Sequence, residues 1–185
     1  MPLSIRNATL DDAADVRALY AHEVATACAS YEYEPPHTDE IRRRMSAILD
    51  AGYPWLIAEV DGGFAGYAYA SSFRSRAGYR WTVENSVYID PMHHRQGIGR
   101  ALMLALIERC AAQGFRQMIA VIGDATNTGS IALHRSLDFI HIGTFPCIGY
   151  KAIENASGRW LDSVQMQRTL GAGSAEPPSP ISGRR

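Results

Sequence analysis

Residues 81–113 constrain the fold of this chain most, because a strand pattern there runs through one tight turn directly into a helix pattern. Residues 81–89 are rich in aromatic and β-branched side chains, and Asp90-Pro91 ends the strand because proline cannot donate to a strand ladder. From Ile98 to Ala112 apolar side chains occupy nearly every face, which indicates a helix buried on most sides, and Gly114 is placed to stop it. The pattern therefore predicts a strand–turn–helix unit at the centre of the fold.

Two glycines, Gly97 and Gly99, stand at the start of this helix. Neither has a β-carbon that would keep a ligand away from the backbone, and the N–H groups of a first helical turn have no partner within the helix. A helix start of this kind favours anions, and phosphates in particular. The glycine spacing alone fits an ordinary glycine-rich turn equally well. It does not fit a dinucleotide-binding fingerprint, whose third glycine would fall at Leu102.

Helix and strand patterns alternate along the rest of the chain. Strand patterns occupy residues 3–6, 55–60, 64–71, 115–123, 139–147 and 160–169, and helix patterns occupy residues 10–25, 39–51 and 127–137. The turn Asp61-Gly62-Gly63 predicts an antiparallel hairpin, and a strand on each side of the central helix predicts a parallel pair. The order therefore predicts a mixed α/β fold. A mixed sheet can splay where strand pairing ends, and so open a slot for an extended ligand.

The length of 185 residues and the apolar share of 46% predict one domain, over residues 1–170. Over residues 171–185, glycine, serine and proline dominate and no apolar period remains, which predicts a disordered tail.

Charge and cysteine content argue against several classes of partner. A net charge of −1 with no basic stripe predicts no nucleic-acid binding, and no apolar stretch is long enough to span a membrane. Cys28, Cys110 and Cys147 are odd in number and lack the spacing of metal ligands. The sequence therefore predicts no metal site and a reducing, cytoplasmic location.

Two segments supply candidate residues for binding a small molecule. Arg74 and Arg76 stand two residues apart in the linker before the central strand, so in an extended segment both side chains would point the same way and clamp one anion. They are also explained as solvated loop arginines. Tyr31 belongs to an aromatic, proline-stiffened loop over residues 27–36, where it would line a pocket or cover the edge of the core.

Several sequence blocks and the helix start together resemble a known family. The blocks are residues 53–60, 65–70, 81–84, 112–115 and 120–123, and the helix start reads His94-Arg95-Gln96-Gly97-Ile98-Gly99. With the element order, they resemble the GNAT superfamily of acetyl-CoA-dependent N-acetyltransferases over about residues 3–170, and within it the phosphinothricin and methionine sulfoximine acetyltransferases. The resemblance implies a mostly antiparallel central sheet, splayed at the cofactor slot and flanked by about four helices. It also implies a homodimer and a small-molecule amine acceptor.

By the same resemblance, acetyl-CoA is the acetyl donor. Backbone amides of the helix start would hold its pyrophosphate, namely those of His94, Arg95, Gln96, Gly97, Ile98, Gly99 and Arg100. Backbone groups of Ser86, Val87 and Tyr88 would pair with its pantetheine arm like an added strand, and Asn127 would contact the same molecule. The chain departs from the family pattern at His94, which replaces the usual Gln or Arg, and at residues 152–157, which are extra. Because loops near a site set its shape, the acceptor preference stays open.

Acetyl transfer needs a base, because an amine attacks a thioester only as the free amine and an amino-acid ammonium is mostly protonated at neutral pH. The resemblance assigns this role to Glu84, directly or through a water molecule, and burial beside aromatic side chains would raise its pKa. A solvent-facing or arginine-paired strand glutamate is the alternative. The resemblance also implies that the N–H of Val87 stabilises the oxyanion formed by the attack.

The departing thiolate then needs a proton or a positive field. His134 matches the position where the resembled group carries histidine, and it would donate that proton or hydrogen-bond to the cofactor. The alternative is a helix histidine packed on the sheet. A covalent cysteine route is disfavoured because no cysteine has an adjacent histidine or acid, so we expect direct transfer in a ternary complex.

Two other functions compete with a small-molecule acetyltransferase. A catalytically silent acyl-CoA-binding sensor would keep the phosphate-binding helix start but need no base, so Glu84 speaks against it. An acetyltransferase for another amine, or for protein N-termini or lysines, is the second alternative. A protein acceptor would require an open acidic groove, and the arginine pair and the enclosed aromatic loop argue against one.

Overall fold

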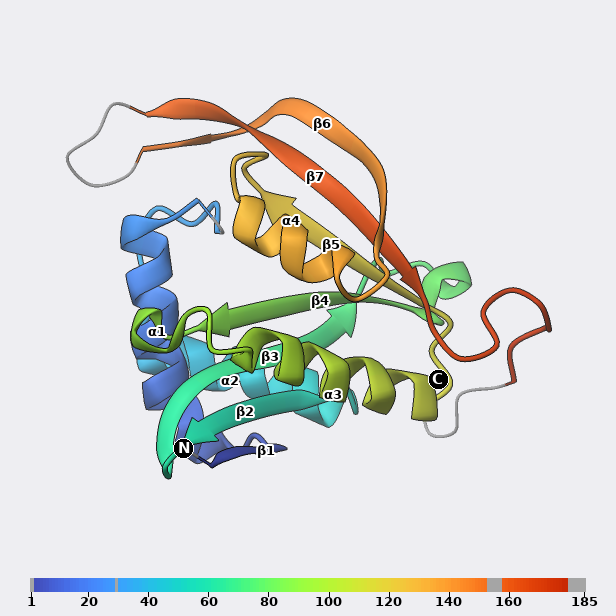
Figure 1. Ribbon diagram of the computed structural model, residues 1–185, viewed down its shortest axis with the longest axis horizontal. Coiled ribbons are helices and arrows are strands. Elements are labelled where there is room, and N and C mark those ends of the chain that lie inside the picture. Colours follow the sequence, from blue (N-terminus) through green and yellow to red (C-terminus); the bar gives the residue numbers. More distant parts are fainter. Residues whose placement is uncertain (1, 29, 153–157, 180–185) are drawn as a thin grey trace.

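Seven strands form one sheet within the described part of the chain (Figure 1). The computed structural model describes residues 2–28, 30–152 and 158–179. The strands are β1 (Leu3–Asn7), β2 (Trp55–Val60), β3 (Gly63–Ser72), β4 (Thr82–Ile89), β5 (Gln117–Gly123), β6 (Ile140–Lys151) and β7 (Arg159–Thr169). The α-helices are α1 (Ala13–Thr26), α2 (Thr38–Asp50), α3 (Ile98–Ala112) and α4 (Thr128–Arg135). The sheet order is β1-β2-β3-β4-β5-β7-β6, so β6 is an edge strand.

The helix starts follow from local sequence chemistry. Gly97 precedes α3 with a φ of 82°, a left-handed conformation that glycine adopts without strain. Gly114 has a φ of 88° just beyond the end of α3, as a helix-terminating glycine does. Asn127 caps α4, because its side-chain oxygen accepts a hydrogen bond from the N–H of Ser130 at 3.1 Å.

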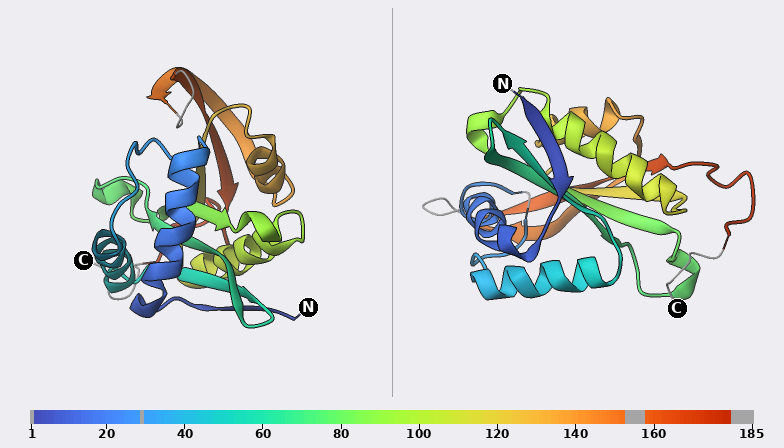
Figure 2. Two further views of the ribbon diagram at one scale, coloured as in Figure 1. Left: turned by 90° about the vertical axis from the view of Figure 1, so that its left-hand side faces the viewer. Right: turned by 90° about the horizontal axis from the view of Figure 1, so that it is seen from below.

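Helices cover both faces of the sheet, as the two side views in Figure 2 show. Helices α1 and α2 lie on one face, where Val16, Ile41 and Trp55 belong to one core cluster. Helices α3 and α4 lie on the other face, where Leu102 and Met118 belong to a second and larger cluster. The functional consequence is that the sheet separates two environments, and any passage between them must run between strands.

Such a passage exists where β4 and β5 diverge. These strands form the parallel pair of the sheet, and their pairing ends at Asn85 and Ala120. Beyond that point β4 continues on β3 as far as Ile89, and β5 continues on β7 as far as Gly123. The other neighbouring strands are antiparallel. The predicted mixed, mostly antiparallel sheet with a splayed slot is therefore confirmed.

The last hairpin differs from the prediction. Strand β6 runs to Lys151, four residues beyond the predicted end at Cys147. Its register on β7 shifts between Phe145 and Gly149, and Cys147 has a φ of 50°. The sequence 146–149 reads as a strand end because a bulge interrupts the alternation, but pairing resumes after the bulge.

Two predicted segments lie partly outside the described residues. Of the extra segment 152–157, the structure describes Ala152. In the C-terminal segment, residues 171–179 contain turns but neither helix nor strand, and the Trp81 indole donates a hydrogen bond to the Ser179 carbonyl at 3.1 Å. Residues 180–185 lie outside the description, so the disordered tail and the domain boundaries stay predictions.

Candidate active site

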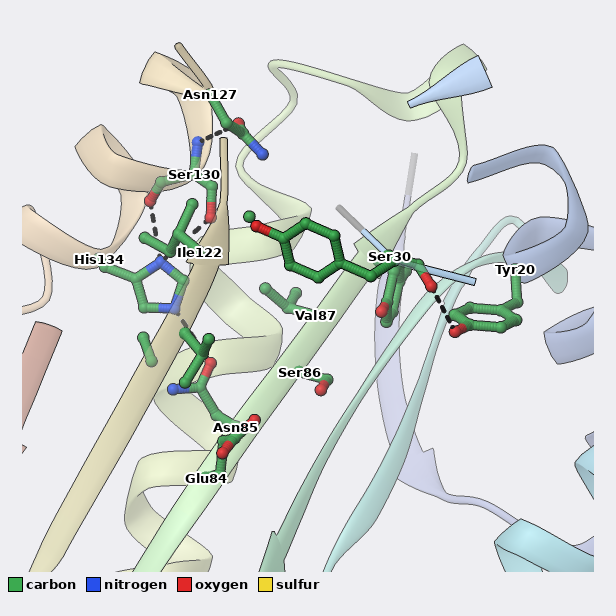
Figure 3. A pocket seen from close by; sticks show the side chains of 15 residues that line it. Tyr20, Ser30, Glu84, Asn85, Ser86, Val87, Ile122, Asn127, Ser130 and His134 are labelled. Carbon is green, nitrogen blue, oxygen red and sulfur yellow. Dashed lines mark hydrogen bonds between the residues drawn. The ribbon is translucent and has the colours of Figure 1, made fainter. Parts of the chain in front are cut away.

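A cavity of about 260 Å³ lies between β4 and β5, where the two strands diverge (Figure 3). It is lined by residues of the two strands, of helices α1 and α4, and of the loops before α2 and α4. The lining consists of Tyr20, Ser30, Tyr31, Glu84, Asn85, Ser86, Val87, Tyr88, Ala120, Val121, Ile122, Gly123, Asn127, Ser130 and His134. We call it the slot cavity.

The slot cavity reaches from one face of the sheet to the other. Side chains alternate between faces along a strand, so Glu84, Ser86 and Tyr88 share one face of β4 while Asn85 and Val87 share the opposite face. Tyr88 packs on the core of α1 and α2, and Val87 packs on the core of α3 and α4. The carboxylate of Glu84 therefore lies on the α1/α2 side, and His134 of α4 approaches from the other side.

Glu84 is the acidic residue of the slot cavity. It is half-buried, and burial raises the pKa of its carboxyl group. No arginine or lysine in the described ranges forms an ion pair with it, which removes the paired-glutamate alternative for that part of the chain. A carboxylate whose pKa is raised toward neutrality, in a cavity beside the place where two strands separate, is placed to accept a proton.

His134 is 2% exposed and is held by both ring nitrogens. Its Nδ1 lies 2.8 Å from the Ser130 carbonyl oxygen, and its Nε2 lies 3.0 Å from the side-chain oxygen of Asn85. The amide nitrogen of Asn85 in turn donates to the carbonyl of Ile119 at 2.9 Å. Burial lowers the pKa of His134. To release a proton from Nε2 into the slot cavity, His134 must exchange its contact with Asn85.

Asn85 is one of the lining residues that the sequence interpretation missed, and Tyr20, Ser30 and Ser130 are others. It occupies the last paired position of β4 on β5, and its side chain joins β5 to α4. On its own face of β4, Asn85 stands between the apolar Val83 and Val87. A polar residue in an apolar row is a signal for a buried hydrogen-bonded site, but which partner it meets depends on the tertiary fold.

A second cavity, of about 540 Å³, adjoins the first at Val87 and Tyr88. It is lined mainly by the turn before α3, the first turn of α3 and one side of α4. The lining consists of Glu23, Val87, Tyr88, Ile89, His93, His94, Arg95, Gly97, Ile98, Gly99, Arg100, Asn127, Gly129, Ser130, Ala132, Leu133 and Ser136. We call it the helix-start cavity.

The helix-start cavity has the properties of a phosphate site. The left-handed Gly97 turns the chain so that the first N–H groups of α3 border the cavity, and arginines 95 and 100 line it. The Nδ1 atom of His93 is buried there without a hydrogen-bond partner in the described residues. His94 donates its Nε2–H to the Ile89 carbonyl at 2.9 Å, which fixes the turn to the end of β4. These residues fit a bound pyrophosphate.

Three predicted residues do not line either cavity. The Gln96 side chain donates to the Met92 carbonyl at 3.1 Å. The guanidinium of Arg74 stacks 5.0 Å from the ring centre of Phe73, and Arg76 is exposed. The linker is not extended, because it bends and enters a short 3₁₀ helix at Ala77–Tyr79. The geometric premise of the arginine clamp therefore does not hold, and its role stays a prediction. Tyr31, in contrast, does line the slot cavity.

In residues 2–28, 30–152 and 158–179, no group of three or more histidine, cysteine, aspartate or glutamate side chains is placed to hold a metal ion. No helix in those ranges is long and apolar enough to cross a bilayer.

Together these features define a class of enzyme. A helix start suited to phosphate groups opens into a slot between two diverging parallel strands, and a carboxylate stands across the sheet from it. This arrangement suits an acyltransferase that binds an extended phosphorylated donor on one face of a sheet and receives an amine from the other.

Residues 18–139 match the Acetyltransferase (GNAT) family. The chain is 48% identical to the phosphinothricin N-acetyltransferase of Alcaligenes faecalis, over 88% of this chain and 80% of that protein. It is 37% identical to the L-methionine sulfoximine/L-methionine sulfone acetyltransferase of Salmonella typhimurium, over 91% of this chain and 95% of that protein. The crystal structure of a phosphinothricin acetyltransferase from Sinorhizobium meliloti, in complex with acetyl-CoA, superposes with a TM-score of 0.92 at 43% identity and covers 99% of this chain and 97% of that one.

The chain therefore belongs to the GNAT acetyltransferase family. It is an N-acetyltransferase with acetyl-CoA as the acetyl donor, as the sequence resemblance predicted. Membership in this family speaks for an enzyme and against the sensor alternative.

Proposed function

We propose that this enzyme acetylates the α-amine of a small amino-acid-like acceptor of the phosphinothricin or methionine sulfoximine type. The similarity to enzymes named for these acceptors supports the substrate class. The observation that carries the reaction is the position of Glu84, half-buried on one face of β4 and facing a cavity that continues to the helix-start cavity on the other side. The acceptor would enter beside α1, and acetyl-CoA would enter beside α3 and α4.

The proposed reaction is a direct transfer in a ternary complex. Glu84 takes a proton from the acceptor ammonium, directly or through water, and the free amine attacks the thioester carbonyl. The N–H of Val87 stabilises the oxyanion. As the carbon–sulfur bond breaks, the attacking nitrogen releases to solvent the second proton that the amide product does not keep. The thiolate receives a proton, for which His134 is our candidate donor. Backbone groups of Ser86 and Tyr88 would hold the donor's arm in the slot.

An acceptor panel tests the substrate class. Thiol release from acetyl-CoA should be fastest with phosphinothricin, methionine sulfoximine or methionine sulfone, and slower with ordinary amino acids. Polyamines and a peptide with a free N-terminus serve as acceptors of other classes. A higher kcat/KM for a polyamine or the peptide than for every amino acid would refute the proposed substrate class.

The linker arginines give a prediction about the carboxylate of the acceptor. Arg74→Ala or Arg76→Ala should raise the acceptor KM about tenfold to a hundredfold, because one charge-assisted contact stabilises a complex by roughly 1.5–3 kcal/mol. The acetyl-CoA KM should not change. Arg80→Ala is the matched control, since Arg80 lies in the same linker and, like Arg74, stacks on an aromatic ring, but is not assigned to the acceptor. Equal losses for an amine without a carboxylate would place the acceptor site elsewhere.

We further propose that the enzyme is a homodimer joined along β6. Large apolar side chains are exposed on this edge strand, with Ile140 64%, Ile142 55%, Phe145 53% and Ile148 56% exposed. An edge strand with unpaired backbone groups and an apolar row is a surface that soluble proteins usually cover. A second copy of the same strand, related by a two-fold axis, would cover both features at once.

Charge substitution on β6 tests the dimer. Phe145→Lys should convert a dimer into a monomer in light scattering, because a lysine cannot be buried unpaired in an apolar interface. Leu104→Lys, an exposed leucine on α3, should leave the mass unchanged. A monomeric wild-type protein at micromolar concentration would refute this proposal.

We also propose a cytoplasmic location. Cys28 and Cys147 are free thiols in the described part of the chain, which supports a reducing compartment. Recovery of the protein in an extracytoplasmic fraction would contradict this assignment.

A further inference from the structure

The loop over residues 27–36 forms the wall of the slot cavity that faces Glu84, through Ser30 and Tyr31. The described residues of this loop, 27–28 and 30–36, form neither helix nor strand, so the position of this wall depends on the contacts that hold it. Our inference about these contacts rests on the proposed function, because it takes this wall to be part of the acceptor pocket.

The Tyr31 ring occupies the space where a side chain at Gly149 of β6 would lie. A β-carbon built on Gly149 would come within 3.0 Å of three atoms of that ring, which real side chains essentially never do. The ring thus packs directly on the backbone of β6, and its hydroxyl lies 3.4 Å from the Asp162 carbonyl of β7. Only glycine at position 149 permits this placement of Tyr31.

A buried lysine fastens the same wall two residues further along. Lys151 is 2% exposed, and its ammonium donates a hydrogen bond to the carbonyl oxygen of Ser30. Burial lowers the pKa of this lysine, while Glu23 and Glu32 nearby favour its charged form. Burying an ammonium group is costly unless it is hydrogen-bonded. An apolar residue at position 151 would extend the strand without this cost, so the burial of a lysine here indicates that its hydrogen bond to the loop has a role.

We propose that Gly149 and Lys151 are positioning residues for the acceptor pocket, which hold Tyr31 and Ser30 at the slot cavity. The end of β6 then sets how well the acceptor binds, without touching acetyl-CoA. Neither residue takes part in the chemical step. Both residues lie at the end of β6, just before the extra residues 152–157. A change in the length or sequence of that segment can therefore alter the acceptor pocket by shifting the end of β6.

A double-mutant cycle tests the role of Gly149. Gly149→Ala should raise the acceptor KM about tenfold, since overpacking of this size shifts the wall, and should leave the acetyl-CoA KM unchanged. In a Tyr31→Ala background the same change should have no further effect, because the ring it displaces is gone. Gly143→Ala on the same strand is the matched control, as its β-carbon would meet no atom within 4 Å. Additive effects of the two substitutions would overturn the proposal.

Lys151→Met supplies an independent readout. It should raise the acceptor KM without changing the acetyl-CoA KM, and Lys151→Arg should restore part of the loss by keeping a donor. Hydrogen exchange at the Glu32 amide, which donates to Ser30 Oγ at 3.1 Å, should become faster in Lys151→Met. Unchanged exchange overturns the fastening itself. Faster exchange with an unchanged acceptor KM overturns the link to the pocket, and a wild-type enzyme inactive on every amine would count against the proposed function alone.

Discussion

Glu84→Gln lowers kcat by about 10²–10⁴-fold, the range expected when one acid–base group is lost from a proton-transfer step. The substitution keeps the shape of the side chain, and Glu84 has no ion pair in the described residues to lose. The acetyl-CoA dissociation constant should therefore change little, because the proposed donor site lies mainly on the other face of the sheet. Steady-state kinetics combined with calorimetric titration of acetyl-CoA separate these two expectations.

The pH dependence of kcat/KM is a second test of Glu84 as the base. A base works as the carboxylate, so kcat/KM of the wild type should rise with pH through the raised pKa of Glu84 and then level off. This rise should disappear in Glu84→Gln. Folding should show the matching linkage: a carboxyl whose pKa is raised in the folded state loses stability as pH increases through that pKa, so Glu84→Gln should raise the melting temperature at neutral pH.

The control for Glu84 is Glu108→Gln, an exposed glutamate on α3 that should alter neither kcat nor its pH profile. If Glu84→Gln retains wild-type kcat at both neutral and alkaline pH, the base is another group.

Gly99→Val should weaken acetyl-CoA binding by at least about a hundredfold. A β-carbon alone fits at this position, because its nearest neighbour would be Leu133 at 3.4 Å, so Gly99→Ala should cost less. The added methyl groups of valine would enter the helix-start cavity and separate the phosphates from the first N–H groups of α3. Losing two charge-assisted hydrogen bonds, at roughly 1.5 kcal/mol or more each, accounts for the factor of a hundred.

Fold stability separates this effect from a damaged helix. Valine in a helix is no worse than glycine, so the melting temperature should be maintained. Ala101→Val places the same side chain in the next position but one of α3, outside the cavity lining, and should keep acetyl-CoA affinity. A folded Gly99→Val protein with wild-type affinity would move the pyrophosphate site away from this helix.

The central unit of the fold was predictable because its determinants are local. The bounds of α3, Ile98–Ala112, agree with the sequence pattern, since the glycines at either end act within one turn of the helix. The hairpin of β2 and β3 was likewise predictable from its turn residues, Asp61-Gly62-Gly63. The slot could be expected as a consequence of a mixed sheet, and the place of Glu84 beside it came from the family resemblance.

Other features depended on contacts between distant segments. The contact between His134 and Asn85 requires α4 to pack beside β4, which no local pattern reveals. The linker arginines were assigned to an extended segment, whereas the chain bends there into a short 3₁₀ helix. Gly149 and Tyr31, which pack together, are 118 positions apart in the sequence. In addition, the bulge before Gly149 interrupts the alternation from which the end of β6 would have been predicted.

The most direct test of the account counts both products of one reaction. The enzyme is incubated with acetyl-CoA and each of phosphinothricin, methionine sulfoximine and methionine sulfone, and free thiol and acetylated amine are measured in the same samples. The account predicts, with at least one of the three, one α-N-acetyl product for each thiol released, and thiol release that requires the acceptor and falls in Glu84→Gln. Thiol release that is equal with and without acceptor, or no acetylated amine from any of the three, would contradict it.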